Sequence, residues 1–253
     1  MKTLHLICVD FRRCIFSFRF FVSVVGVPVL MLAAIVGIME GASSVWYLAR
    51  LSLQGSGIDA MIKCILPVFA FGLSYAAEWE EKAERYWVIR TGARRYALSK
   101  TLNCAVSGFL TIFLGIGIFV LMLLPLYPAY APFGDSSYEM LMAEGKITGW
   151  LLYLTHQGLT GAMSAVCGLW FSTWLPNRFA TAAAPFILYF SLLRITGRMK
   201  LPPYLDPINW CSGIYDAETC LGTIAVKFAI AFLLCAVMGE FAKLHIDRRL
   251  LRE

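Results

Sequence analysis

Ionisable side chains inside apolar stretches are the residues of this chain whose type and position could do chemistry. Four polar residues stand within such stretches: Lys63, His156, Gln157 and Lys227. A charged group at the centre of a bilayer costs about 2.5–3.5 kcal/mol on insertion scales, so such residues are candidates for a transport pathway. One interpretation is a polar outer vestibule through which cargo leaves. His156 lies deepest and has a side chain that can titrate near neutral pH.

Structural explanations for the same residues stay open. Asp59 precedes Lys63 by four residues, so the two side chains can satisfy one another on a helix. Lys227 is close to the expected outer end of its segment and can extend its ammonium group to the interface. A single histidine such as His156 is also commonly a packed, hydrogen-bonded side chain. On this interpretation the polar residues carry no function.

Motifs for catalysis and for metal binding are absent from the sequence. HExxH, GxSxG and paired carboxylates within an apolar segment do not occur. A membrane-embedded enzyme needs such clustered groups, so we expect that the chain is not an enzyme. The eight cysteines form no CxxC and no Cys/His metal spacing. We therefore expect no bound metal and no cofactor held directly by this chain.

Composition places the chain among polytopic membrane proteins. Hydrophobic residues make up 59% and charged residues 15%, and the mean hydropathy is +0.70. Soluble domains have about 45–50% apolar and about 25% charged residues. The net charge of +6 comes from Lys and Arg at the ends of the apolar segments. That distribution is typical of loops that face anionic lipid, and we expect no nucleic-acid partner.

Apolar stretches of about 20 residues, enough to cross about 30 Å of hydrocarbon, predict an all-α protein with six transmembrane helices. We expect the helices at residues 20–39, 58–76, 103–124, 147–174, 180–193 and 220–239. The fifth is short and lies between prolines, so both a continuous and a broken helix fit the sequence.

Residues 1–19 have apolar side chains near helical spacing and basic side chains mostly elsewhere. This pattern favours an amphipathic helix at the membrane interface, and a plain basic flank of the first span is the alternative. We expect no cleaved signal peptide, because the charged region is long and no clean small-residue cleavage site follows it.

Charge asymmetry predicts the orientation. Lys and Arg are dense before residue 20, in residues 77–102 and after residue 240, and sparser in the other connections. The positive-inside rule then places both termini and residues 77–102 in the cytoplasm of a plasma-membrane protein. Residues 194–219 become an extracellular loop. Cys211 and Cys220, nine residues apart, either form a disulfide in an oxidising environment or stay two free thiols.

The charged segment between the second and third predicted spans stands out from its apolar surroundings. It is defined here as residues 78–100, EWEEKAERYWVIRTGARRYALSK. Nothing between Glu78 and Arg90 breaks a helix, and two acid-before-base pairs at i,i+4 spacing support one. Gly92 ends this helix and a second, basic helix leads into the third span. A solvated helix gains nothing by exposing Trp87, so a partner surface or the lipid interface should cover it.

The charged segment resembles the first intracellular loop of type 2 ABC exporter permeases. There, acidic residues follow the second span, a short coupling helix comes next, and a small turn leads to an aromatic, an aliphatic and a lysine residue. Tyr96, Leu98 and Lys100 match that closing pattern. The acidic positions have four candidates: Glu78, Glu80, Glu81 and Glu84. Six spans, an interfacial helix and a long loop before the last span extend the resemblance over nearly the whole chain.

One residue pair departs from that family's pattern. Family members often carry proline in the turn, where this chain has Gly92 and Ala93.

The resemblance implies a permease subunit of an ATP-driven exporter for an amphipathic or hydrophobic cargo such as a peptide, a lipid or a drug-like molecule. Its partners would be membrane lipid, a second permease (a second copy or a sister subunit) and cytoplasmic ABC ATPase subunits that bind ATP and Mg²⁺. Consistently, the chain lacks GxxxxGK[ST], the loop that cradles nucleotide phosphates. The expected ATPase contact comprises seven residues: Glu80, Glu81, Glu84, Arg85, Trp87, Arg90 and Arg94.

Two alternatives remain at this stage. An ATP-independent secondary carrier would show internal repeats and broken helices near the middle of the membrane, and we find no repeat in the sequence. The charged segment can also be a solvated loop that binds no partner.

Overall fold

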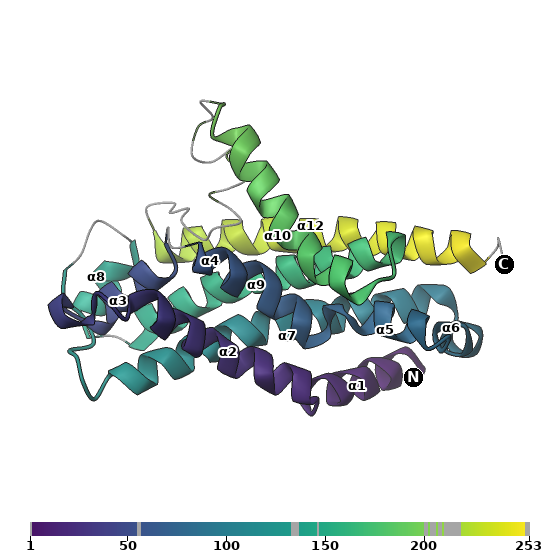
Figure 1. The fold of residues 1–253 in the computed structure, drawn as a ribbon, viewed down its shortest axis with the longest axis horizontal. Helices are drawn as coiled ribbons and strands as arrows, with labels where there is room; N and C mark the ends of the chain where they lie inside the picture. Colours follow the sequence, from purple (N-terminus) through teal and green to yellow (C-terminus); the bar gives the residue numbers. More distant parts are fainter. Residues whose placement is uncertain are drawn as a thin grey trace.

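The computed structural model describes residues 2–54, 57–132, 137–145, 147–199 and 219–250, together with Pro202, Asp206 and Asn209. Within these residues all regular secondary structure is helical and no strand occurs. Figure 1 shows most helices aligned along one bundle. The N-terminal helix, the short helix α6 and the end of α12 gather at one end of the bundle, and α3 and α8 lie at the other. These are called here the α6 end and the α3–α8 end.

Four helices of the described residues are long and apolar enough to cross a membrane: α2 (Phe18–Ile35), α7 (Ala93–Leu123), α10 (Arg178–Thr196) and α12 (Cys220–Leu250). The number of candidate spans rises to five if one bent pair of helices, Ile58–Gly72 and Ser74–Glu80, is counted as a single span. The chain is therefore a helical membrane protein, as its composition predicts. The count of six spans stays a prediction.

Helix α9 (Ile147–Trp174) covers the expected fourth span and is not among those four. Its 28 residues are long enough, since they extend about 42 Å at 1.5 Å per residue. It carries polar residues such as His156 and Gln157, and no stretch of it is apolar enough to count among the four. The helix packs against α7, α10 and α12, and most of its side chains are buried. Enclosure by protein lets a helix keep polar side chains away from lipid.

The expected second span, residues 58–76, is not one straight helix. It starts as α4 (Ile58–Ala60) and continues through two π-helical turns, η2 (Met61–Ile65) and η3 (Val68–Gly72). A bend of 47° then separates it from α5 (Ser74–Glu80). Pro67 lies between the two π-helical turns. Proline has no N–H to donate to the residue four before it, and the wider turns on both sides accompany that missing bond.

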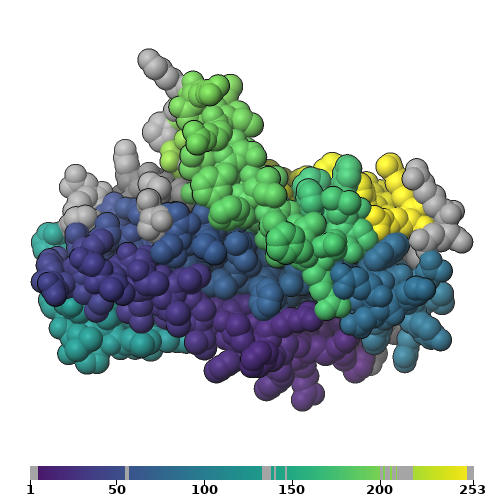
Figure 2. Space-filling view, viewed as in Figure 1, coloured from purple at the N-terminus to yellow at the C-terminus, as the bar shows by residue number. Residues whose placement is uncertain are grey.

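The first predicted span, 20–39, ends early, because α2 stops at Ile35, whereas the helices of the third, fifth and sixth spans are longer than expected. α7 starts ten residues before the predicted third span, and α12 continues through the basic tail. α10 is continuous through Pro185, which decides between the two alternatives for the fifth span. Figure 2 shows α10 standing out as a ridge from the face of the bundle. α1 (Lys2–Ile15) is helical, as predicted, and packs along α7.

Glycines bring α7 and α9 close together at the centre of the bundle. A Cβ atom added to Gly108 would collide with the carbonyl oxygen of Gly161, and one added to Gly161 would collide with that of Gly108. Small residues at such a crossing let two helices approach until their backbones touch. Gly161 belongs to a stretch rich in small residues, Thr160 to Ala165, whose spacing in the sequence suits tight helix packing, and the structure shows such packing at Gly161.

Two segments expected as loops fold into helices that cap the α3–α8 end. They are α3 (Val45–Ser52), which follows the short turn η1 (Met39–Gly41), and α8 (Ser137–Ala143). Trp46 of α3 is buried, and its ring meets Trp150 and Tyr153 of α9 edge-on. Such edge-to-face aromatic contacts favour a packed cap over a solvated loop.

Candidate functional site

The charged segment forms two helices instead of the expected continuous helix from Glu78 to Arg90. α5 ends at Glu80, and α6 (Glu84–Thr91) begins after a short break. Lys82, within the break, has a φ of 56°, in the left-handed region that ends a helix. Gly92 has a φ of 82° and separates α6 from α7, where the sequence predicts a turn.

A buried ion pair fixes α5 against α7. Oε1 of Glu78 accepts a hydrogen bond from Lys100 Nζ at 2.6 Å, and Oε2 accepts one from the Tyr96 hydroxyl at 2.6 Å. The Lys100 ammonium also lies 5.1 Å from the ring centroid of Phe71. The Glu78 carboxylate therefore binds α7, and the predicted i,i+4 pair with Lys82 is not its partner. A surface pair of that kind contributes only about 0.3–0.5 kcal/mol, so the contacts of Glu78 with Lys100 and Tyr96 are favoured over a pair with Lys82.

Two further acidic residues of α5 and the following break connect to α10. The Arg178 guanidinium lies 2.6 Å from Glu80 Oε2 and 3.6 Å from Glu81 Oε1. Asn177 caps the start of α10 by accepting from the backbone N–H groups of Phe179 and Ala180. Asn is among the preferred residues for this position. The α5 end and the α10 start are thus held together.

Helix α6 has two unlike faces. Glu84 and Val88 are buried, and Val88 shares an apolar cluster with Tyr96 of α7 and Ile246 of α12. On the other face, Tyr86 is 83% exposed and Ile89 is 84% exposed. We define this exposed surface, with the neighbouring exposed side chains Arg85 and Arg90, as the α6 face.

Trp87 is covered by its own chain. Its ring lies 5.6 Å from the guanidinium carbon of Arg13 on α1, and the side chain is half-buried. The expectation that a partner or lipid covers Trp87 therefore needs correction. The apolar side chains left in the open are Tyr86 and Ile89, which follow from helical spacing once Val88 is known to face inward.

The seven residues expected at the ATPase contact are not one surface. Glu80 and Glu81 pair with Arg178, Glu84 is buried, and Trp87 packs under α1. The exposed members without that pairing to Arg178 are Arg85, Arg90 and Arg94.

The four residues expected in a pathway lie inside the bundle. Relative exposure is 2% for Lys63, 1% for His156, 4% for Gln157 and 0% for Lys227. The idea that Lys227 extends to the interface is therefore wrong. These four buried side chains of the bundle interior are called here the buried polar cluster.

Hydrogen bonds hold part of the buried polar cluster. Lys63 Nζ donates a hydrogen bond to the Leu53 carbonyl at 2.9 Å, so Lys63 has a backbone partner in addition to the expected pair with Asp59. The Tyr138 hydroxyl lies 2.8 Å from His156 Nδ1. Nε2 of His156 is buried and has no hydrogen-bond partner among the described residues. A buried polar atom without a partner is costly, and it marks a position where a proton, a water or a ligand group fits.

Glu139 of α8 anchors the cap over the buried polar cluster. Its Oε1 accepts from Trp46 Nε1 at 3.1 Å and from the Arg50 guanidinium at 3.0 Å. Burial and the nearby Glu139 carboxylate raise the pKa of Tyr130 above its ordinary value. The sequence has no signal for these contacts, because Trp46 and Glu139 are far apart in the chain.

Cys211 lies outside the described residues, so its expected pairing with Cys220 is not part of the described structure. Among the residues that the structure does describe, no three His, Cys, Asp or Glu side chains are grouped to hold a metal ion.

Comparison with protein-family models, with curated proteins and with solved structures finds no match for this chain. The likeness to ABC exporter permeases therefore depends on the charged segment and the helix pattern described above.

Proposed function

We propose that this chain is the permease subunit of an ATP-driven ABC exporter in the plasma membrane. It would move an amphipathic or hydrophobic cargo outward, using separate ATPase subunits that bind ATP and Mg²⁺. In this proposal α6 and both termini face the cytoplasm, and a second permease subunit, identical or related, completes the pathway. The chain itself would carry no catalytic group.

The single observation that carries the proposal is the two-faced helix α6. Its outer face, with Tyr86 and Ile89, offers apolar anchors between arginines, a composition typical of binding hot spots. Its inner face packs through Val88 against α7, in an apolar cluster that also contains Ile246 of α12. A push on the α6 face would therefore reach α7 directly. Rigid-body movement of packed helices is a common form of conformational switching.

The buried polar cluster supplies the second half of the proposal. In this structure Tyr138 of α8 bonds His156, and the carbonyl of Leu53, directly after α3, bonds Lys63, which fits a pathway that is closed at the α3–α8 end. Movement of α7 and α9 against the cap would expose His156 and the two lysines to a passing cargo. The cluster would then interact with polar or acidic groups on that cargo.

The test is the double variant Tyr86→Ala/Ile89→Ala, co-expressed with each candidate ABC ATPase of the same genome. Both side chains are exposed, so the fold should not change. We expect the co-purified ATPase to fall about tenfold or more, because hot-spot anchors dominate binding. The matched control is Leu126→Ala, which removes a 69% exposed side chain beyond the other end of α7 and should not alter co-purification. Full ATPase recovery with the double variant would refute the proposal.

An ATP-independent secondary carrier is the alternative, and one observation favours it. The span from Ile58 to Glu80 is broken by π-helical turns and a 47° bend, with Lys63 inside the first π-helical turn. Carriers use discontinuous helices of this kind at their binding sites. The two functions separate in vesicles that contain only this protein. Uptake of a candidate cargo driven by a proton or sodium gradient, with no nucleotide, would support the carrier.

A further inference from the structure

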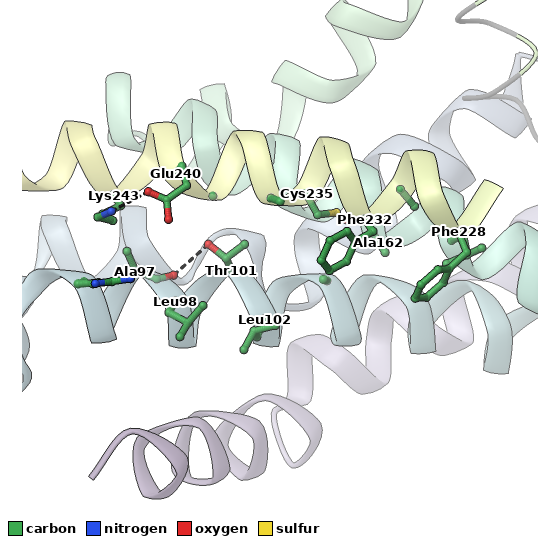
Figure 3. A pocket seen from close by; sticks show the side chains of 16 residues that line it. Ala97, Leu98, Thr101, Leu102, Ala162, Phe228, Phe232, Cys235, Glu240 and Lys243 are labelled. Carbon is green, nitrogen blue, oxygen red and sulfur yellow. Dashed lines mark hydrogen bonds and ion pairs between the residues drawn. The ribbon is translucent and has the colours of Figure 1, made fainter. Parts of the chain in front are cut away.

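A groove lies between α7 and α12 on the outside of the bundle, with Leu159 and Ala162 of α9 beneath it. Its volume is about 420 Å³. Figure 3 shows Glu240 and Lys243 at one end and Phe228 near the other. Small side chains on the two helices make the room: Ala97, Thr101, Ala105, Ala231, Ala236 and Gly239.

The two ends of the groove differ in chemistry. Arg94, Glu240 and Lys243 line one end. Lys243 Nζ lies 2.6 Å from Glu240 Oε2, so these two charges offset each other and Arg94 leaves a net positive charge. The other end is walled by Phe228 and Phe232, whose side chains are 58% and 68% exposed. The groove is therefore apolar along its length and cationic at one end.

The length of the groove fits half of a bilayer. From Arg94 to Ala105 on α7 the axial rise is about 16 Å, and from Phe228 to Lys243 on α12 it is about 22 Å. One leaflet contributes about 15 Å of the roughly 30 Å hydrocarbon core. The basic ends of both helices meet at the same end of the bundle, where lipid headgroups would lie. An acyl chain that starts there would end beside Phe228.

We propose that this groove holds one anionic glycerophospholipid from the surrounding bilayer. Its phosphate contacts Arg94 and Lys243, and one acyl chain runs along Ala236 and Phe232 towards Phe228. The proposal concerns a bound lipid and does not depend on the cargo or on ATP coupling. The net positive charge favours an anionic headgroup over a zwitterionic one.

A second copy of the chain fits the groove less well. Two copies in one membrane run parallel, so a two-fold contact through this face would bring identical ends together. Arg94 and Lys243 of one copy would then approach the same residues of the other. A lipid phosphate is the complementary charge for that end.

The test uses the full chain purified in a neutral detergent, with palmitoyl-oleoyl phosphatidylglycerol or phosphatidylcholine added at equal concentration. Native mass spectrometry counts the lipids that stay bound as collision energy rises. We expect one phosphatidylglycerol to be retained in clear preference to phosphatidylcholine. In Arg94→Ala/Lys243→Ala this preference should fall about fivefold for each charge removed. Ala236→Leu narrows the apolar part and should reduce retention of both lipids.

The matched control is Arg12→Ala/Arg19→Ala, which removes two exposed arginines away from the groove and should leave the retained phosphatidylglycerol unchanged. Equal loss in this control, or unchanged retention in both groove variants, would overturn the proposal. A dimer that Ala236→Leu dissociates without any change in bound lipid would overturn it in favour of a second copy. No ATPase is present in these measurements, so their outcome is independent of the exporter proposal.

Discussion

The α6 end and the buried polar cluster both contain buried charged groups, but they differ in how these groups are paired and in what lies exposed beside them. At the α6 end, Glu78 and Lys100 satisfy each other in the interior, and the α6 face beside them stays open. In the cluster, His156 and the lysines are enclosed by the cap, and His156 Nε2 keeps no partner among the described residues. The first region presents an exposed surface as it stands. The second has to open before it can bind anything.

Breaking the Glu78–Lys100 pair gives the largest expected effect. Lys100→Met leaves a buried carboxylate without its counter-ion, which should lower the free energy of unfolding by about 3–5 kcal/mol. Denaturation with sodium dodecyl sulfate in mixed micelles measures this energy. Glu78→Gln/Lys100→Met removes the stranded charge and should recover most of the loss.

Lys243→Met is the matched control for that experiment, because it removes a lysine from a pair with an exposed partner. It should change the stability little. A similar, small effect for Lys100→Met would mean that the α6 end is not held by its buried pair.

An intermediate effect is expected in the buried polar cluster. Tyr138→Phe removes the hydrogen bond to His156 Nδ1 and should cost about 1–3 kcal/mol, because the imidazole then lacks both partners. The same substitution in a His156→Phe background should cost less, which a double-mutant cycle reports. Tyr86→Phe alters an exposed hydroxyl and serves as the control. Equal costs in both backgrounds would show that the two side chains are not coupled.

The smallest effect is expected where α5 meets α10. Arg178→Ala releases Glu80 and Glu81, but the side chains are 39%, 41% and 68% exposed. Water and salt screen such contacts, so the loss should be about 0.5 kcal/mol and should shrink at about 1 M salt. Unfolding at low and high ionic strength measures both values. A loss that salt does not alter would place these charges among the buried contacts.

Local patterns predict the class of the fold and some of its packing. Long apolar runs predict the helices that can span a membrane, since burial in lipid needs about 20 apolar residues in a row. The small residues around Gly161 predict a close helix crossing, because a missing Cβ is visible in the sequence itself. Both inferences depend only on residues that are neighbours in the chain.

Contacts between distant residues account for what the sequence does not predict. Glu78 has Lys82 one helical turn away, yet it pairs with Lys100 across the break. Trp46 and Glu139 turn two apparent loops into a cap, although 93 residues separate them. Which face of α6 stays exposed depends on Ile246 from the last helix. None of these choices can be made from hydropathy or spacing, because each depends on the folded neighbours.

The π-helical turns on either side of Pro67 offer the second span a way to change its hydrogen-bond register. A π-helical turn contains one residue more than an α-helical turn. If one turn relaxed to α geometry, the hydrogen-bond register would shift by one residue, and everything beyond it would rotate by roughly 100° about the axis. Lys63 lies in the first of these turns. A small exchange of backbone partners could therefore swing its ammonium group from one side of the helix to another without unfolding the span.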